Sequence, residues 1–342
     1  MSKVLILTFA YNAQQTIVRT IESVLNQQHN NFTYVIADNG SLDNTGDIIR
    51  RFAAKDKRIV PVYALKNNTV NVHARFLMGI LTDLNEYDYF VNLDADDEYL
   101  PTFISDTVPF LRDNDLDFAA CRSDFICEDT GENLNNYILE ENILVCDELE
   151  FSSKLSDYYR FVRALWGTLY SMEFIKFGFI TRNSVVSIVN DFYEEAGDEY
   201  IYGKDNIAAF KILENSKRFG VLAKILHKYY VRQNSLTYTF DTSRSEADVL
   251  RLLAFKEFLT NKCGYISNDN LVYIYTSYLK EISDSSRIIV NANISEAEKE
   301  LHLRKILDNG ETSLSLSSNL FPDYLKQNFY EVLSSGGFGH LI

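Results

Sequence analysis

Apolar strand-like runs alternate with amphipathic helical segments over the first hundred residues, and this order restricts the chain to few folds. The runs are Val4–Phe9, Phe32–Ala37, Arg58–Ala64 and Asp88–Val91. Apolar residues with helical spacing lie between them, at Ile17, Ile21, Val24 and Leu25 (continuing to Gln28), then Ile48, Ile49 and Phe52, then Val72, Phe76, Ile80 and Leu84. This βαβαβαβ order predicts an α/β fold with a mainly parallel sheet and right-handed crossovers.

Polar residues follow three of the predicted strands. Tyr11 and Asn12 follow the first, Asp38 and Asn39 the second, and 94–97 the fourth. Because the carboxyl ends of parallel strands meet at one edge of a sheet, these residues should line one crevice. Nucleotides bind in such a crevice in open α/β folds.

The acidic segment, Asn92–Tyr99, contains the carboxylates of Asp94, Asp96 and Asp97 within four residues. Their mutual repulsion costs free energy, and a bound divalent cation removes that cost. Oxygen ligands suit Mg²⁺ or Mn²⁺. Taken alone, these residues are equally compatible with a solvated acidic turn.

Composition excludes several classes of protein. Hydrophobic residues at 46% and charged residues at 24% are typical of a globular protein. The formal net charge of −15 argues against a nucleic-acid partner. The apolar run at Val4–Ala10 is too short for a signal core or a transmembrane segment. The four cysteines have no zinc-site spacing, so we expect them to be reduced thiols. We therefore expect a cytoplasmic protein, with peripheral attachment to the inner face of the membrane as a further option.

Two common phosphate-binding loops are absent from the sequence. There is no Gly-x-x-x-x-Gly-Lys-Ser/Thr, and no Gly-x-Gly-x-x-Gly follows the first strand. A P-loop kinase or a nicotinamide dehydrogenase is therefore disfavoured. A diphosphate bound without a glycine-rich loop needs another source of positive charge, which a metal ion would supply.

Four motifs in order resemble family-2 glycosyltransferases with the GT-A fold. They are Phe9–Asn12, Thr20–Gln28, Val35–Thr45 and Asn92–Asp97. The resemblance covers residues 3–105 most closely and 160–240 less closely. It implies a Rossmann-like, mixed and mainly parallel sheet that binds a nucleotide sugar.

The resemblance also implies which residues bind the nucleotide. They are Phe9, Ala10, Tyr11, Asn12, Asp38, Asn39 and Arg75. Tyr11 would stack on the base, and Arg75 would meet phosphate or base, although a solvated helix arginine is the alternative. Asn39 stands where the family often has a second aspartate. It leaves uridine as the default base and the base identity open.

The same resemblance places the metal and the diphosphate at the acidic segment. Asp94, Asp96 and Asp97 match the family's metal-binding motif around Ala95, with one carboxylate on the ribose and another on Mn²⁺ or Mg²⁺. Arg232, in a later strand-and-loop motif, would clamp phosphate. His227 nearby is expected to be structural.

Inverting transfer needs a general base, because an acceptor hydroxyl is a weak nucleophile at neutral pH. The resemblance points to Asp205, an acid at the start of a predicted helix, where aspartate is also a common capping residue. The alternatives are Glu194, Glu195, Asp198 and Glu199.

Trp166 lies in a segment that resembles the family's acceptor-side motif, with Thr168 in place of the usual lysine. The indole would stack on a sugar ring or pack in the core.

The pattern changes after Asp241. Helical stripes predict a C-terminal helical appendage, and its role is packing, acceptor recognition or assembly of a homo-oligomer. The stripes comprise Ala247, Leu250, Ala254 and Phe258; Leu271, Tyr275, Tyr278 and Ile282; Ala297, Leu301, Ile306 and Leu307; and Phe321, Leu325, Phe329 and Val332. We therefore expect a catalytic domain at 1–241, with a nucleotide half at 1–105 and an acceptor half at 106–241, and a helical domain at 242–342.

These features predict an inverting, metal-dependent glycosyltransferase that moves glucose or galactose from a UDP-sugar to a glycan or glycoprotein. Two alternatives remain open. A sugar-phosphate nucleotidyltransferase shares the layout but usually carries a glycine-rich basic loop that 9–14 lacks. The other is a nucleotide-sugar-binding scaffold, which is favoured only by the departure of Asn39 and Thr168 from the residues usual in the family.

Overall fold

The computed structural model describes residues 2–64, 85–134, 137–180, 204–232, 235 and 238–342. The chain divides into two compact units. The first comprises Met1–Asp147, Asp157–Asp198 and Asn215–Arg232, and the second comprises Glu148–Ser156, Glu199–Glu214 and Gln233–Ile342. The predicted helix over Val72–Leu84 lies outside the described residues. The boundary at 241/242 stays a prediction, because compactness does not show that a segment folds by itself.

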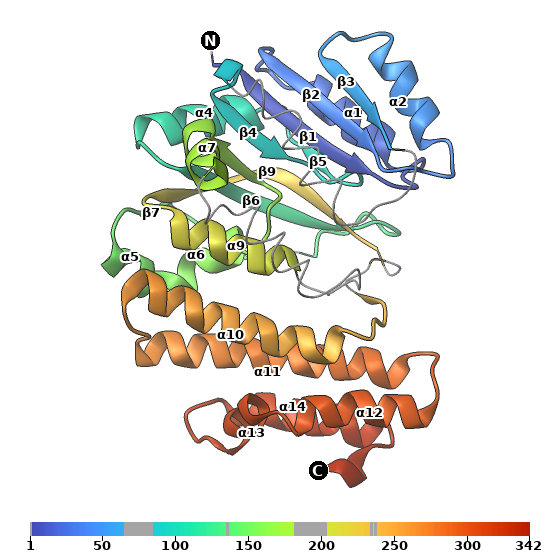
Figure 1. The fold of residues 1–342 in the computed structure, drawn as a ribbon, viewed down its shortest axis with the longest axis vertical. Helices are drawn as coiled ribbons and strands as arrows, with labels where there is room; N and C mark the ends of the chain where they lie inside the picture. Colours follow the sequence, from blue (N-terminus) through green and yellow to red (C-terminus); the bar gives the residue numbers. More distant parts are fainter. Residues whose placement is uncertain (1, 65–84, 135–136, 181–203, 233–234, 236–237) are drawn as a thin grey trace. The chain divides into compact units, whose positions relative to one another are not determined.

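The first unit is built on one mixed β-sheet (Figure 1). Its described strands are β1 Val4–Ala10, β2 Phe32–Asp38, β3 Ile59–Tyr63, β4 Tyr89–Asn92, β5 Glu98–Tyr99, β6 Phe118–Cys127, β7 Ile143–Val145, β8 Thr168–Ser171 and β9 Phe219–Val231. They run in the order β3-β2-β1-β4-β8-β6-β9-β5, and β7 pairs with β9. Strands β3, β2, β1 and β4 are parallel, whereas β8 runs antiparallel to β4 and β6. The predicted α/β class and its parallel first half are confirmed.

The described helices of the first unit are α1 Ile17–Leu25, α2 Thr45–Ala53, α4 Phe103–Asp113 and α7 Met172–Ile180. Most of α6 Leu155–Val162 also belongs to this unit, which resumes at Asp157. Alternate residues of β1, Val4 and Ile6, are buried in one apolar cluster with Ile17, Ile21 and Val24 of α1. The cluster also includes residues of α2 and α4, so these three helices share one face of the sheet. The predicted stripe of α1 is thus confirmed, but the helix ends at Leu25, before Gln28.

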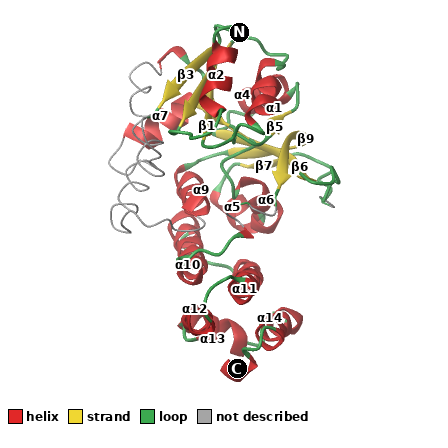
Figure 2. Cartoon of the chain, turned by 90° about the vertical axis from the view of Figure 1, so that its right-hand side faces the viewer, coloured by secondary structure: helices red, strands yellow, loops and turns green. Residues whose placement is uncertain are grey.

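The second unit is helical (Figures 1 and 2). Its described helices are α5 Glu148–Ser153, α9 Lys204–Asn215, α10 Arg244–Cys263, α11 Asn268–Asn291, α12 Glu296–Leu307, α13 Gly310–Ser317, α14 Asp323–Ser335 and the short η3 Gly339–Leu341. Helix α11 packs against α10, α12 and α14. Ser295 forms a capping box with Glu298 at the start of α12, and Pro322 is the N-cap of α14. The predicted C-terminal helices are confirmed, and α13 is an addition that no stripe indicated.

Three apolar residues of the predicted stripes, Leu250, Ala297 and Leu301, do not face the interior. Leu250 is 36% exposed and Leu301 is 56% exposed. The buried face of α10 includes Leu252 and Phe255 instead. Helix α10 contacts α5, α11 and α12, so it buries residues on more than one side, which a single stripe cannot represent.

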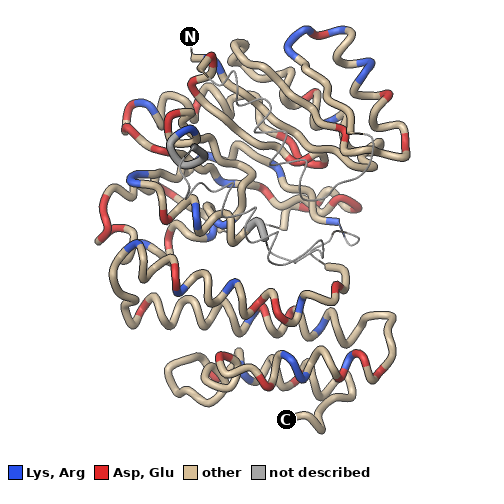
Figure 3. The backbone as a smooth tube through the Cα atoms, in the orientation of Figure 1, with Lys and Arg blue, Asp and Glu red and all other residues tan. Residues whose placement is uncertain are grey.

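Charges of both signs occur along these helices (Figure 3). In the part of the chain that the structure describes, no helix combines the length and the apolar composition that a membrane span needs. The two longest described helices, α10 and α11, both contain acidic and basic residues.

Gly220 of β9 provides a test of the packing in the first unit. A Cβ at this position would lie 2.7 Å from Cε1 of Phe110 and 3.0 Å from Cδ1 of Leu116. Because the core must shift to admit it, we expect Gly220→Ala to lower the free energy of unfolding by about 1–3 kcal/mol in urea denaturation. Gly310→Ala is the control, since a Cβ there would have no atom within 4 Å apart from its chain neighbours and its own helix backbone. Equal losses in both variants would contradict this packing.

Candidate active site

The parallel strands bring the predicted nucleotide-binding residues to one edge of the sheet. Ala10, the last residue of β1, is paired in register with Asp38, the last residue of β2. On the other side of β1, Leu7 is paired with Asn92, the last residue of β4. The segments that follow β1, β2 and β4 therefore start side by side, as the sequence predicts.

Hydrogen bonds connect the loops after β1 and β2. The Asn12 N–H donates to Ser41 Oγ at 2.9 Å, and the Leu42 N–H donates to Asn12 Oδ1 at 2.8 Å. Asn12 has a φ of 50°, a left-handed conformation that asparagine adopts more readily than most residues. The Ser41 N–H donates to Asp38 Oδ1 at 3.0 Å. These bonds fix the main chain beside the candidate base-binding residues.

The predicted nucleotide residues differ in exposure. The Tyr11 side chain is 43% exposed, which leaves its ring accessible for stacking. Asp38 and Asn39 are buried, as is Ala10, while Phe9 is half-buried. Arg75 lies outside the described residues.

Gly46 provides the space for the Asp38 carboxylate. It is the second residue of α2, and a Cβ there would lie 2.6 Å from Asp38 Oδ2. The orientation of this carboxylate therefore depends on a glycine at position 46.

The acidic segment alternates between partly exposed and buried residues. Asp94 and Asp96 are partly exposed, whereas Asp97 is 1% exposed. Asp97 Oδ1 accepts a hydrogen bond from the Tyr230 N–H at 3.0 Å, and its Oδ2 lies 3.4 Å from His227 Nε2. Asp97 thus faces the interior, so it is placed differently from the two other predicted metal ligands.

His227 is completely buried beside Asp97, which agrees with a structural role. Its Nδ1 lies 3.0 Å from Ser123 Oγ, and its ring stacks on Trp166 at 5.0 Å between centroids. Burial lowers the pKa of His227 to about 4 and raises the pKa of Asp97 to about 7. The imidazole is therefore neutral at physiological pH, and the two groups are not a pair of opposite charges.

Trp166 belongs to an aromatic cluster with Phe125, Tyr229 and His227. Its indole stacks on Tyr229 at 5.2 Å and meets Phe125 at 6.1 Å with near-perpendicular planes. Because Trp166 is half-buried, part of the ring remains accessible. This position is compatible with both predicted roles, core packing and stacking on a sugar.

The donor set of the acidic segment fits Mg²⁺ or Mn²⁺. Asp94 and Asp96 offer carboxylate oxygens, and Arg232 forms an ion pair with Asp96. No group of three or more His, Cys, Asp or Glu that could hold a metal occurs among the described residues. An ion at this place would take its remaining ligands from a diphosphate and from water, as Mg²⁺ commonly does.

Asp205, the predicted base, is the second residue of α9. Its side chain is not among the described ones, so its role stays a prediction. The alternatives Glu194, Glu195, Asp198 and Glu199 lie outside the described residues.

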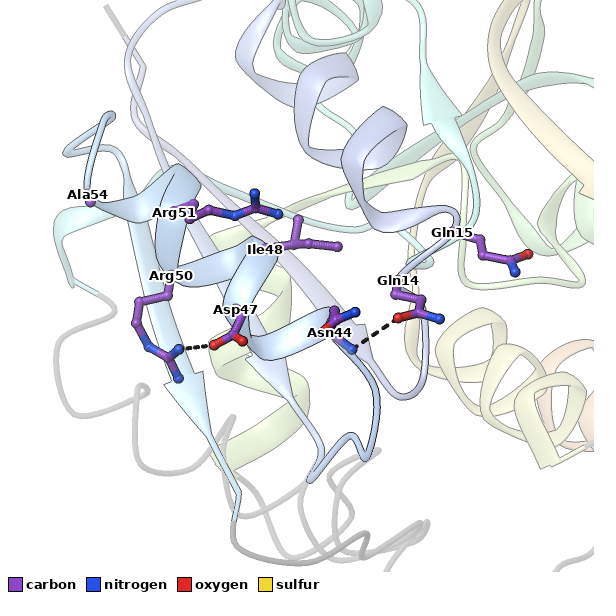
Figure 4. Close-up of a pocket in the computed structure, with 8 residues that line it drawn as sticks. All are labelled: Gln14, Gln15, Asn44, Asp47, Ile48, Arg50, Arg51 and Ala54. Atoms are coloured by element: carbon purple, nitrogen blue, oxygen red, sulfur yellow. Dashed lines mark hydrogen bonds and ion pairs between the residues drawn. The ribbon is translucent and has the colours of Figure 1, made fainter.

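A separate open depression of about 810 Å³ lies beside α2 (Figure 4). Its lining residues are Gln14, Gln15, Asn44, Asp47, Ile48, Arg50, Arg51 and Ala54. Gln14 accepts a hydrogen bond from the Asn44 N–H, and Arg50 pairs with Asp47. None of the predicted nucleotide or metal residues lines it, so it is distinct from the candidate site.

Side chains of α1 and of its N-cap Thr16 hold the acidic segment, and no sequence motif indicated them. Thr16 Oγ1 donates to the Ala95 carbonyl at 2.9 Å, and Ser23 Oγ accepts from the Tyr99 N–H at 3.2 Å. Residues 16 and 23 are two helical turns apart, so they lie on the same side of α1. The sequence signal that could have indicated these contacts is the spacing of polar residues beside the apolar stripe of α1.

The fold and the position of the acidic segment define a GT-A-type α/β protein. The sequence profile of glycosyl transferase family 2 matches residues 5–185, just over half of the 342-residue chain, and the chain belongs to that family. The resemblance that the motifs indicated is confirmed.

Two curated relatives match shorter segments. The UDP-Glc:alpha-D-GlcNAc-diphosphoundecaprenol beta-1,3-glucosyltransferase WfaP of Escherichia coli is 34% identical over 119 residues, covering 35% of this chain and 45% of that protein. The putative teichuronic acid biosynthesis glycosyltransferase TuaG of Bacillus subtilis is 27% identical over 143 residues, covering 42% and 55%. The chain thus matches about half the length of these relatives.

Among solved structures, S. aureus TarS 1-349 in complex with UDP superposes with a TM-score of 0.54 at 15% sequence identity. The match covers 96% of this chain and 91% of that one. At this identity the likeness concerns the fold.

Replacing Gly46 tests the position of Asp38. We expect Gly46→Ala to displace the carboxylate and to weaken UDP binding about tenfold or more, because a hydrogen bond to a charged group contributes about 1.5–3 kcal/mol. Stability should fall less than in Gly220→Ala, since alanine is favourable in a helix and the atom that must move is the end of a side chain. Isothermal titration with UDP and Mn²⁺ measures the affinity, and Gly310→Ala is the control. Unchanged affinity would argue against base recognition by Asp38.

Proposed function

We propose that this protein is an inverting, metal-dependent glycosyltransferase that transfers glucose or galactose from a UDP-sugar to a glycan or glycoprotein. The observation that carries the proposal is the acidic segment at the carboxyl edge of parallel strands, with Asp94 and Asp96 accessible there. Membership of glycosyl transferase family 2 supports the same reaction class.

The nucleotide would bind across the ends of β1 and β2. The accessible ring of Tyr11 suits stacking on a base, and the Asp38 carboxylate suits the imide N–H of uracil. UDP is supported by the complex of TarS with UDP and by the donor in the printed name of WfaP.

Asp94 and Asp96 would hold Mn²⁺ or Mg²⁺ together with the diphosphate. Such an ion supplies positive charge that stabilises the leaving diphosphate as the glycosidic bond breaks. Arg232, beside Asp96, brings a guanidinium to the same place and suits bidentate binding of phosphate oxygens. Asp97, turned inward, would orient the segment and bind no ion.

Asp205 would remove the proton from the acceptor hydroxyl as that oxygen attacks the anomeric carbon. The proposal follows from its position at the start of α9, where the family carries its catalytic acid. The accessible part of Trp166 offers a stacking surface for a sugar ring.

The acceptor class follows from the relatives. The name of WfaP gives GlcNAc-diphosphoundecaprenol as its acceptor, and the name of TuaG refers to teichuronic acid biosynthesis. We therefore favour a bacterial surface glycan over a glycoprotein.

The test is incubation with UDP-glucose, UDP-galactose and other nucleotide sugars in the presence of Mn²⁺, followed by measurement of released nucleoside diphosphate. Release from one donor, increased by a glycan acceptor, is expected. Pyrophosphate released from UTP and a sugar phosphate would indicate the nucleotidyltransferase. Binding without release would indicate the scaffold.

The three acids should differ in their effect on turnover. We expect Asp96→Asn and Asp94→Asn to lower kcat/KM by on the order of a hundredfold, because each removes a negative charge that would hold the metal ion at the diphosphate. Asp97→Asn should retain most activity, since the amide oxygen can still accept from the Tyr230 N–H. The measurement is UDP release over a range of Mn²⁺ concentrations. Equal losses in all three variants would contradict separate roles.

Asp205→Asn tests the general base. We expect kcat for transfer to fall by roughly 10²–10⁴-fold, the usual contribution of a positioned base. Affinity for UDP and Mn²⁺ should be unchanged, because Asp205 would act on the acceptor. Asn206→Asp in the same background restores an acid one residue away and is the control for charge alone. Transfer at the original rate in Asp205→Asn would move the base to another residue.

A further inference from the structure

Arg19, on α1, contacts the acidic segment through its main chain. The guanidinium Nη2 donates to the Asp96 carbonyl at 2.6 Å, and Nε lies 3.3 Å from the same oxygen. Arg19 lies between Thr16 and Ser23 on the same side of the helix, and these two bind the main chain of Ala95 and Tyr99. One side of α1 therefore holds the acidic segment along its length.

Glu128 and Tyr230 hold the Arg19 guanidinium in place. Nη1 and Nη2 donate to the two carboxylate oxygens of Glu128, both at 2.6 Å. The guanidinium carbon lies 3.5 Å from the centroid of the Tyr230 ring. A bidentate carboxylate and an aromatic face both restrict a guanidinium more than they would an ammonium.

The same partners connect to other parts of the segment. The Tyr230 N–H donates to Asp97 Oδ1, and the Tyr230 hydroxyl donates to Glu98 Oε1 at 2.7 Å. The Glu128 N–H donates to the carbonyl of Val231 at 3.0 Å. Arg19 therefore joins α1, the end of β6 and β9 around the carbonyl of Asp96.

These contacts leave the carboxylate of Asp96 outside the interaction with Arg19. Arg19 binds its carbonyl, whereas Arg232 pairs with its carboxylate. The main chain is thus fixed on one side while the side chain remains directed to the other. Groups that orient a metal ligand without touching the metal commonly affect metal affinity 10–100-fold.

We propose that Arg19 is a positioning residue, which sets the orientation of the Asp94 and Asp96 carboxylates for the metal–diphosphate complex by holding the Asp96 carbonyl. The proposal rests on the proposed function for its ligand, a nucleoside diphosphate with a divalent cation. Its structural part, the immobilisation of 94–99, is independent of that ligand.

The chain offers a matched control in Arg58. This arginine donates to both carboxylate oxygens of Asp56, stacks over Phe32 at 4.5 Å and is 28% exposed, against 25% for Arg19. It makes no described contact with residues 94–99. Arg58→Gln therefore removes a similar arginine without changing the acidic segment.

The first measurement is amide hydrogen exchange of the ligand-free full-length protein. We expect Arg19→Gln to increase the exchange rate of amides in 95–99 at least tenfold, and Arg58→Gln to leave them unchanged. The second measurement is titration of Mn²⁺ in the presence of UDP. Arg19→Gln should weaken Mn²⁺ affinity about tenfold or more relative to Arg58→Gln, and Arg19→Lys should recover only part of it.

The outcomes separate the two hypotheses. The positioning role would be overturned if Arg19→Gln and Arg58→Gln showed equal exchange rates of the amides in 95–99. Equal Mn²⁺ affinities in the two variants would overturn it as well. Failure of the wild-type protein to bind Mn²⁺ with UDP would overturn the proposed function, and exchange in 95–99 would still decide whether Arg19 immobilises the segment. If Arg19→Gln does not fold, Glu128→Gln tests the same contact with the charge of Arg19 retained.

Discussion

The candidate site depends on hydrogen bonds between the side chains of α1 and the main chain of the acidic segment. A buried main-chain carbonyl without a partner is costly, so a segment that leaves a sheet must find donors elsewhere. Thr16 and Arg19 supply them to Ala95 and Asp96. These bonds use the main chain and involve neither the Asp94 nor the Asp96 carboxylate. In the proposed site, the bonds from α1 and the binding of a metal ion would thus involve different atoms of the segment.

Much of the fold follows from apolar periodicity, because burial on a sheet or on one side of a helix leaves a regular pattern. Strands β1, β2 and β4, the stripe of α1 and the C-terminal helices were all predictable in this way. The edge at which Tyr11, Asp38 and Asp94 meet was predictable too, since parallel strands place their carboxyl ends together. The antiparallel β8 was not, because pairing partners far apart in sequence leave no local pattern.

The site itself was predictable in composition but not in orientation. Three nearby aspartates look alike in a sequence, yet only Asp97 is buried, against the neutral imidazole of His227 and the Tyr230 N–H. That difference depends on β9, more than a hundred residues away along the chain. The role of Arg19 is equally hidden, since an arginine on a helix usually faces solvent. Bonds from side chains to distant main-chain atoms are specified only once the elements have packed.

The alternation of exposed and buried residues from Asn92 to Tyr99 makes the length of this segment more critical than its composition. Exchanging one side chain alters a single position. Removing or adding one residue would reverse this alternation for the side chains that follow. The partly exposed acids would then face the apolar interior, and the buried side chains would face water.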